Sequence, residues 1–262
     1  MNKKYDYTLN DIKKAINKIQ ISKGDTIYIS CNLSKLGFPK FKKIDLLPKY
    51  LFNNIKKKIS NNGTIVAPAH TFFLNNRKDY FDPKKTLTES GSFSNFILKK
   101  KNSFRSLHPL TSMVAVGKKA KYICKKNGKN SYGENSPYQK LFNLNTKFIS
   151  IGIKYNLNCS QVHHVEYLNK VPYRFLKKIK KNIKISGKIK KLFFYIYVLK
   201  KSFVNMKRNR NKLIFKNFKK FSKIQKVKLG SNFIYIYNFS EFIKITNELM
   251  KENKFCWLGK KK

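Results

Sequence analysis

The sequence contains few acidic residues and few arginines. Its 262 residues include 59 Lys and Arg but only 12 Asp and Glu, and five of the basic residues are arginine. Arginine provides the bidentate contacts by which many proteins bind guanine and phosphate, so an excess made mostly of lysine argues against a dedicated nucleic-acid-binding surface. The net charge of +47 still predicts attraction of anions and repulsion of polycationic substrates.

Cysteines and long apolar runs are also scarce. The four cysteines form no Cys-x-x-Cys pair, and the N-terminal sequence lacks the apolar run of a signal peptide. No segment approaches the roughly 20 apolar residues that a membrane-spanning helix needs. We therefore expect a reduced, cytoplasmic protein without a transmembrane segment.

The remaining composition supports a folded core, because 41% of the residues are hydrophobic and 15% are aromatic. Helical spacing of apolar residues after the capping residue Thr8 predicts a first helix, and further helices are expected over residues 46–59 and 240–249, the last capped by Ser240. Short apolar runs predict strands at 26–30, 63–68, 113–116, 148–153 and 229–237. This alternation indicates an α/β sheet, in which binding groups gather on loops beyond the strand ends.

Residues 167–240 form a separate compositional segment, with 22 Lys and Arg and no acid. The favoured interpretation is a basic, solvent-facing extension whose apolar pieces, Leu192–Leu199 and Leu213–Phe215, pack as strands. A second interpretation is a surface that docks on acidic lipid, since lysines beside aromatic residues bind anionic membranes.

The four histidines, His70, His108, His163 and His164, all lie between positions 70 and 164. In the segment 160–166, a helix capped by Ser160 would place His163 and Glu166 three residues apart on one face. A carboxylate in that position orients a histidine as a general base. The alternatives are a solvated His–Glu pair without function, and a metal site made with Cys159, which is disfavoured because the spacing matches no common metal-binding pattern.

Two other polar segments are candidates for binding. Residues 105–112 combine a fixed cation, a histidine and hydroxyl groups, and they fit either an anion or carbonyl site or a polar loop with local hydrogen bonds. Residues 30–37 resemble a strand-to-loop cradle whose backbone N–H groups could meet a phosphate. Within that loop, Cys31 could carry an acyl group, although a small buried thiol is the commoner state.

Taken in order, five segments resemble the antibiotic or aminoglycoside 3-N-acetyltransferase family. Residues 25–37 are similar to the first strand and Ser-Ser-Leu-Ser-x-Leu-Gly loop of that family, with Cys31 in place of a serine, and residues 63–72 to its Gly-Thr-Leu-x-x-Pro-x-x-Thr-Phe strand. Residues 105–117, 133–141 and 151–166 complete the set, with Ser160 where the family usually has threonine. The resemblance covers about 8–174 and resumes over 228–258.

The resemblance implies a single domain over 1–262, with a poorly matched Lys-rich segment at about 175–227. The implied fold is a three-layer α/β/α sandwich with a mixed sheet, unlike the common acetyltransferase fold with a pyrophosphate loop. It also implies direct acetyl transfer from acetyl-CoA in a ternary complex, without a metal. His163, oriented by Glu166, would be the base, while His108, Ser112 or backbone N–H groups would stabilise the oxyanion. The residues implied around the coenzyme are Ser30, Asn32, Leu33, Ser34, Gly37, Thr71, Arg105, Ser106 and Ser112.

The predicted function is therefore acetyl-CoA-dependent N-acetylation of an amine on an amino sugar or an aminoglycoside-like acceptor. Aminoglycosides are polycations that need acidic clefts, so the charge of +47 fits better with a neutral or anionic amine, such as an amino sugar on a nucleotide. We expect acetyl-CoA and a small amine as partners and no specific nucleic acid. The sequence does not determine the oligomeric state, and a homodimer is one possibility. The alternative is a non-enzymatic basic protein on the same scaffold that docks nucleic acid or acidic membrane.

Overall fold

The structure is a computed structural model, and it describes residues 5–41, 43–154, 160–204 and 224–258. Its centre is a seven-stranded mixed sheet with the strand order β3-β4-β2-β1-β5-β9-β8. β1 runs parallel to β2 and β5, and the other pairs in this sheet are antiparallel. The strands are β1 (Thr26–Cys31), β2 (Thr64–His70), β3 (Phe104–Arg105), β4 (Thr111–Gly117), β5 (Lys147–Ile151), β8 (Gln225–Leu229) and β9 (Asn232–Asn238).

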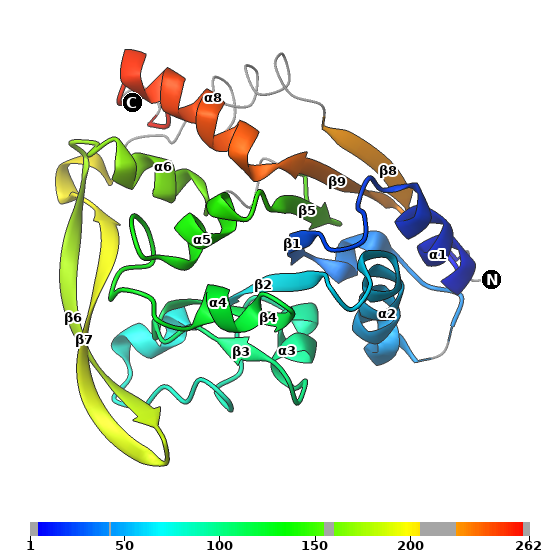
Figure 1. Cartoon of the computed structure of the whole chain (residues 1–262), viewed down its shortest axis with the longest axis horizontal. Helices are drawn as coiled ribbons and strands as arrows, with labels where there is room; N and C mark the ends of the chain where they lie inside the picture. The colour runs from blue at the N-terminus through cyan, green and yellow to red at the C-terminus, as the bar shows by residue number, and fades with distance from the viewer. Residues whose placement is uncertain (1–4, 42, 155–159, 205–223, 259–262) are drawn as a thin grey trace.

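Helices cover both faces of the sheet (Figure 1). The alternation of side chains along each strand explains this, since Ile27 and Ile29 of β1 enter one apolar core and Tyr28 enters the other. One face packs against α1 (Leu9–Lys18), α2 (Leu47–Ile59) and α3 (Ser92–Leu98), and the other against α4 (Ala120–Cys124), α5 (Pro137–Asn143), α6 (Val162–Leu168) and α8 (Phe239–Glu252). The predicted three-layer α/β/α sandwich with a mixed sheet is confirmed.

Local sequence determines where the helices begin, and two predicted caps are wrong. Thr8 forms the expected capping box with Asp11 at the start of α1. The N-cap position of α6 is Gln161 rather than Ser160, and its side chain makes no capping hydrogen bond. Asn238 caps α8 instead of Ser240 by accepting a hydrogen bond from the Ser240 backbone N–H. Among the described residues, no helix has the length and apolar character needed to cross a bilayer.

The predicted strand over 229–237 is in fact two strands. β8 ends at Leu229, and β9 starts after a tight turn in which Gly230 has a φ of +58°. A side chain at Gly230 would also collide with the backbone oxygen of Leu36, so the turn needs glycine. The residues Gly-Ser-Asn at 230–232 interrupt the apolar run and are a turn signal, which the single predicted strand passed over.

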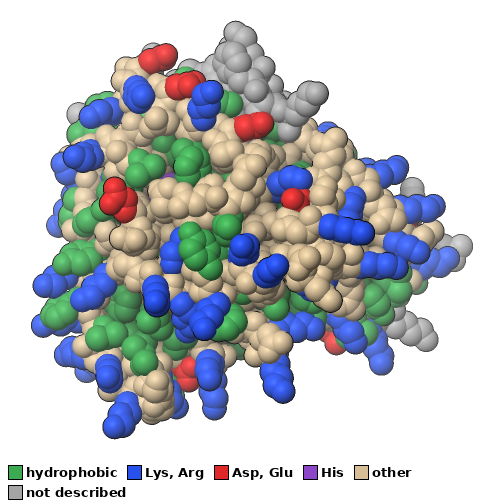
Figure 2. Space-filling view, viewed as in Figure 1, with side chains coloured by type: hydrophobic (Ala, Val, Ile, Leu, Met, Phe, Trp, Pro, Cys, Tyr) green, Lys and Arg blue, Asp and Glu red, His purple; other side chains and the backbone are tan. Residues whose placement is uncertain are grey.

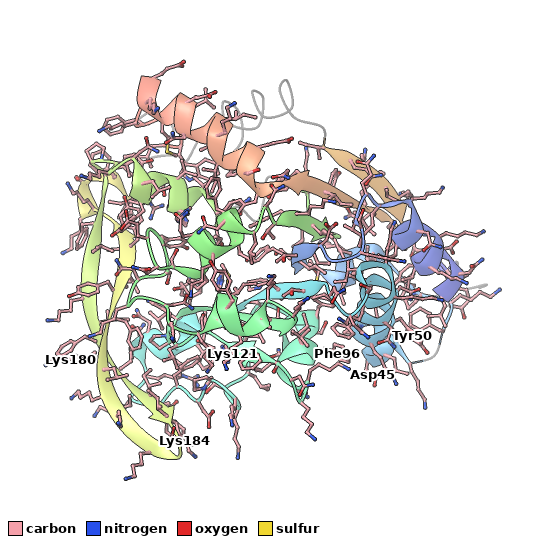
Figure 3. All side chains as sticks on the ribbon, in the orientation of Figure 1. Asp45, Tyr50, Phe96, Lys121, Lys180 and Lys184 are labelled. Atoms are coloured by element: carbon pink, nitrogen blue, oxygen red, sulfur yellow. The ribbon has the colours of Figure 1, made fainter. Side chains whose placement is uncertain are left out.

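The first part of the Lys-rich segment forms a long hairpin of β6 (Arg174–Ile185) and β7 (Lys188–Leu199), seen at the left edge of Figure 1. The predicted strand over Leu192–Leu199 is confirmed, whereas Leu213–Phe215 lies outside the described residues. Phe194 and Ile183 fasten the hairpin to the body through a small apolar cluster. Lysines such as Lys180 and Lys184 line its outer part (Figure 3).

Candidate active site

The candidate site lies where the parallel strands end. The carboxyl ends of β1, β2 and β5 share one edge of the sheet, and the antiparallel pairing brings the start of β4 to the same edge, with His70 opposite Thr111. Loops beyond such an edge are where α/β sheets bind ligands. α6 follows β5 in the chain and supplies the residues described next.

His163 and Glu166 form the contact predicted from their spacing. Nδ1 of His163 lies 2.6 Å from Oε2 of Glu166, one turn further along α6. A carboxylate only accepts hydrogen bonds, so Nδ1 carries the hydrogen and Nε2 keeps its lone pair. The His163 side chain is 24% exposed, whereas Glu166 is fully buried. This arrangement gives the basic nitrogen of His163 access to solvent and to a ligand.

Two further side chains hold the Glu166 carboxylate. The Tyr173 hydroxyl donates to Oε1 at 2.8 Å, and Nε of Arg174 lies 2.7 Å from Oε2. Burial acts to raise the pKa of Glu166, but His163, Arg174 and Tyr173 together outweigh it and leave the pKa below its ordinary value. Glu166 is therefore ionised at neutral pH and can stabilise an imidazolium on His163.

His163 opens into a cavity of about 460 Å³ beside the hairpin. One wall is the end of β7, and another is the 3-10 helix at Phe72–Asn76 that follows β2. Tyr132 packs edge-on against the His163 ring, with the ring centroids 5.7 Å apart. The residues lining the cavity include Phe72, Asn75, Asn76, Leu110, Thr111, Ser131, Tyr132, His163, Arg174 and Ile196–Leu199. We call this space the amine cavity.

His108, by contrast, is fully engaged in holding the structure together. Its Nδ1 accepts hydrogen bonds from the backbone N–H groups of Leu110 and Thr111, so Nε2 carries the hydrogen and donates to the Tyr195 backbone oxygen at 3.0 Å. Neither ring nitrogen is available to donate to a developing oxyanion. The predicted catalytic use of His108 is therefore replaced by a structural one, which ties β7 to the start of β4.

The polar residues of the 105–112 segment form a buried network as well. Arg105 donates from Nε to the Ser112 hydroxyl at 2.9 Å and from the guanidinium to the backbone oxygens of Ala69 and Thr86. The Ser112 hydroxyl donates to Ala69, and the buried Ser106 hydroxyl accepts from the Met113 backbone. These side chains brace β2, β3 and β4 through internal hydrogen bonds, and their expected contact with the coenzyme stays a prediction.

Thr71 shares this structural role, because its hydroxyl donates to the backbone oxygen of Pro109 and the residue is fully buried. His164 is also buried, and its Nδ1 accepts from the Gly133 backbone N–H at 3.0 Å. Of the two adjacent histidines, only His163 lines the amine cavity. The three-residue spacing to Glu166 favours His163 in the sequence, and the direction of each side chain on α6 agrees with this choice.

The first-strand loop lies at the same sheet edge, on the other side of β1 from the amine cavity. Ser30 is buried in β1, and Leu33 begins a 3-10 helix that ends at Leu36. The Ser34 hydroxyl donates to Oδ1 of Asn32 at 2.7 Å. Gly37 has a φ of +88°, and a side chain there would collide with Asp6 and Ser231. This explains why the loop sequence ends in glycine.

A cavity of about 740 Å³ opens beside this loop, and three lysines line it: Lys35, Lys154 and Lys226. Asn32 and Gly152 form its floor between β1 and β5. Gly152 approaches the Asn32 backbone oxygen so closely that a Cβ would not fit. Clustered ammonium groups over exposed backbone suit the binding of phosphate groups. We call this space the lysine-loop cavity.

Sequence reasoning missed several residues of the site. Tyr132, Tyr173, Arg174 and Tyr197 all surround the His163–Glu166 pair, and the Tyr197 hydroxyl donates to the Glu166 backbone oxygen at 3.2 Å. Three of them lie in the acid-free segment that had been treated as an extension. The only available signal was Arg174 itself, one of five arginines in a chain rich in lysine.

Histidine burial predicts a loss of stability in weak acid. Burial lowers the pKa of both His108 and His164 to about 4, from an ordinary value of 6.5. The unfolded chain binds these protons near pH 6.5 while the folded one does not, so stability is full above this pH and falls as the pH drops toward 4, by about 3 kcal/mol for each histidine. Glu166, with its lowered pKa, stabilises the fold at neutral pH, and this contribution is lost only at more acidic pH.

Urea unfolding at pH 7 and pH 4.5 measures this effect. We expect a clearly lower free energy of unfolding at pH 4.5, and a smaller pH dependence in His164→Asn, whose side-chain oxygen can still accept the Gly133 hydrogen bond. Equal stability of the native protein at the two pH values would show that these histidines are not held neutral.

No group of three or more His, Cys, Asp or Glu side chains that could hold a metal ion occurs in the described parts of the chain. Cys159, the third member of the disfavoured metal site, lies outside those parts. Burial raises the pKa of the Cys31 thiol to about 12, so this cysteine stays protonated and is a poor acyl acceptor.

Comparison with solved structures identifies the same fold in several acetyltransferases. AAC-IIIb with CoASH bound matches with a TM-score of 0.78 and 17% identity, covering 97% of this chain and 98% of that one. Sisomicin-bound AAC-VIa matches with a TM-score of 0.78 and 14% sequence identity, covering 94% of this chain and 98% of that one. The YokD protein from Bacillus subtilis matches with a TM-score of 0.75 and 17% sequence identity, covering 96% of each chain.

A direct search found no match among curated protein sequences. The sequence model of the family described as aminoglycoside 3-N-acetyltransferase, however, matches residues 34–251, which is most of the chain. This match includes the His163–Glu166 pair and the hairpin that encloses it, and it confirms the predicted class of acetyl-CoA-dependent acyltransferase. The chain belongs to the aminoglycoside 3-N-acetyltransferase family.

Proposed function

We propose that the protein transfers the acetyl group of acetyl-CoA to an amine on an amino sugar or aminoglycoside-like acceptor, with His163 as the general base. The observation that carries this assignment is the His163–Glu166 pair, which presents a basic Nε2 to the amine cavity. The family membership and the CoASH-bound structure of a relative support acetyl-CoA as the donor.

The reaction is a direct transfer. The acceptor nitrogen attacks the thioester carbonyl carbon, a C–N bond forms, and the C–S bond breaks as the coenzyme leaves as a thiolate. Nε2 of His163 takes the proton that the nitrogen loses, and Glu166 stabilises the resulting imidazolium through Nδ1. The proton then passes to the thiolate or to solvent. A protonated Cys31 agrees with transfer that has no acyl-enzyme stage.

The coenzyme phosphates bind in the lysine-loop cavity in this proposal. Its lysines lie beside Asn32, at the end of the first-strand loop. Four strand intervals separate β4, at the amine cavity, from β9, and at about 4.8 Å each they span about 19 Å. An extended pantetheine arm covers such a distance, so the thioester can reach His163 while the phosphates stay among the lysines.

Calorimetric titration of acetyl-CoA, at moderate and high salt and with ATP as the anion control, tests this coenzyme site. We expect one coenzyme per chain, bound more tightly than ATP at high salt. The double variant Lys35→Glu/Lys154→Glu should weaken acetyl-CoA binding by at least tenfold, because each substitution reverses a charge in the cavity.

The matched control is Lys23→Glu/Lys57→Glu, which changes the net charge equally on exposed positions near α1 and α2. We expect less than a twofold effect from it. Binding no tighter than that of ATP, and lost in salt, would refute the coenzyme site and favour the alternative of a basic docking protein. A cytoplasmic location and a homodimer stay predictions, and light scattering would test the second.

A further inference from the structure

Three cavities of the structure have no acidic side chain in their lining. None of the amine cavity, the lysine-loop cavity and a third cavity of about 230 Å³ has an Asp or Glu among its lining residues. Figure 2 shows the same imbalance on the visible face of the molecule, where basic side chains far outnumber acidic ones. A polycationic acceptor needs carboxylates to replace its hydration, and these cavities offer none.

Three acids contact the lining residues of the amine cavity, or lie near them in the chain, and they do not change this conclusion. Glu166 contacts His163 but is fully buried, and Arg174 already neutralises it at 2.7 Å. Glu89 is exposed and accepts from the Phe73 backbone N–H at 3.3 Å, outside the cavity lining. Glu134, two residues beyond Tyr132, is also exposed and outside the lining.

The third cavity adjoins the amine cavity, because Thr111 and Ser131 line both, and the hydroxyl groups of these two residues bond each other. It lies under the loop after α4, and three lysines of that loop line it: Lys125, Lys126 and Lys129. Phe193 and Phe194 of β7 close its apolar side. An anionic group held by these three ammonium groups would therefore lie next to a molecule bound at His163, with Thr111 and Ser131 shared by the two cavities.

The same loop also offers unused hydrogen-bond acceptors. The side-chain oxygens of Asn127 and Asn130 are buried without a hydrogen-bond partner, and both residues line the third cavity. Buried acceptors of this kind are costly unless a ligand supplies a donor, such as a sugar hydroxyl. The lining of the third cavity therefore combines lysines that can bind an anion with amide oxygens that can accept hydrogen bonds from hydroxyl groups.

We propose that the acceptor is an amino sugar that also carries an anionic group, a phosphate or a carboxylate, and that the third cavity binds this group while the amine lies at His163. This inference rests on the proposed acetyl transfer and specifies its acceptor. It contrasts with the polycationic sisomicin bound by the relative AAC-VIa.

A panel of acceptors tests the proposal through the rate of CoA release. Glucosamine and glucosamine 6-phosphate form a pair that differs only by the phosphate, and sisomicin represents the polycations. We expect kcat/KM to be at least tenfold higher for the phosphorylated sugar than for glucosamine, and lowest for sisomicin. Faster turnover of sisomicin than of glucosamine 6-phosphate would overturn the proposal.

The double variant Lys125→Glu/Lys129→Glu then locates the anionic group. We expect the KM for glucosamine 6-phosphate to rise about tenfold, with little change for glucosamine or acetyl-CoA, while Lys23→Glu/Lys57→Glu changes none of the three. A raised KM for acetyl-CoA would assign the third cavity to the coenzyme and reject an acceptor role. No turnover of any panel member, with acetyl-CoA binding intact, also counts against the anionic acceptor, whereas loss of coenzyme binding refutes the proposed function itself.

Discussion

Replacing His163 with alanine is expected to lower kcat about 1,000-fold, whichever amine proves to be the acceptor. General-base catalysis by a positioned side chain contributes about 10²–10⁴-fold, and a loss of 1,000-fold corresponds to about 4 kcal/mol of transition-state stabilisation. His163 lines the amine cavity, and its Nε2 is the nitrogen left free by the contact with Glu166. Without it, the attacking nitrogen must lose its proton to water.

The binding of acetyl-CoA should change less than twofold in His163→Ala, because the ring does not line the lysine-loop cavity. The melting temperature should also change little, since the ring is partly exposed and Glu166 keeps Arg174 and Tyr173 as partners. A large kcat effect with intact binding and folding separates a chemical role from a structural one.

The effects of His108→Asn on stability and kcat are to be compared with those of His163→Ala. Through its ring nitrogens, His108 bonds the Tyr195 backbone oxygen and the backbone N–H groups of Leu110 and Thr111, and it packs against Phe194. Its replacement should lower stability but leave kcat of the folded protein within a few-fold of the native value. If His108→Asn instead lost as much kcat as His163→Ala while remaining folded, the oxyanion role first expected of His108 would be restored and the network described here would be secondary.

The sequence was sufficient to predict the sheet and the contact between His163 and Glu166 for a physical reason. β1 and β2 are buried on both faces, so their apolar runs are strong signals, and a His–Glu pair three residues apart on a helix meets without help from the rest of the fold. Both predictions depend on interactions that are local in the chain or uniform along a strand.

The rest of the site depends on contacts between distant segments. Tyr197 reaches Glu166 from β7, 31 positions away, and the hairpin that carries it looked like a solvated extension because lysines dominate its outer part. Arg105 is the opposite case: an arginine in a polar segment suggests an anion site, but three backbone and side-chain oxygens bond its guanidinium group internally. Neither outcome is visible without the tertiary packing.

Glu166→Gln should produce the second large effect, on both activity and stability. Oε2 accepts from His163 and faces Arg174, whereas Oε1 accepts only from the Tyr173 hydroxyl. A glutamine will therefore turn its NH₂ toward Tyr173, whose hydroxyl can rotate to accept, and keep its oxygen toward His163. The histidine tautomer survives, but the charge that stabilises the imidazolium is lost, so we expect kcat to fall about 100-fold.

The same substitution leaves Arg174 as a buried cation without a counter-charge, which typically costs about 3–5 kcal/mol of stability. Urea unfolding measures this loss, and the double variant Glu166→Gln/Arg174→Met separates the two effects. Removing the cation should restore much of the stability, because the methionine fills the space against Tyr197 without a charge, yet it should not restore kcat. Recovery of activity along with stability would mean that Glu166 acts only by holding the fold, and that His163 needs no carboxylate to accept the proton.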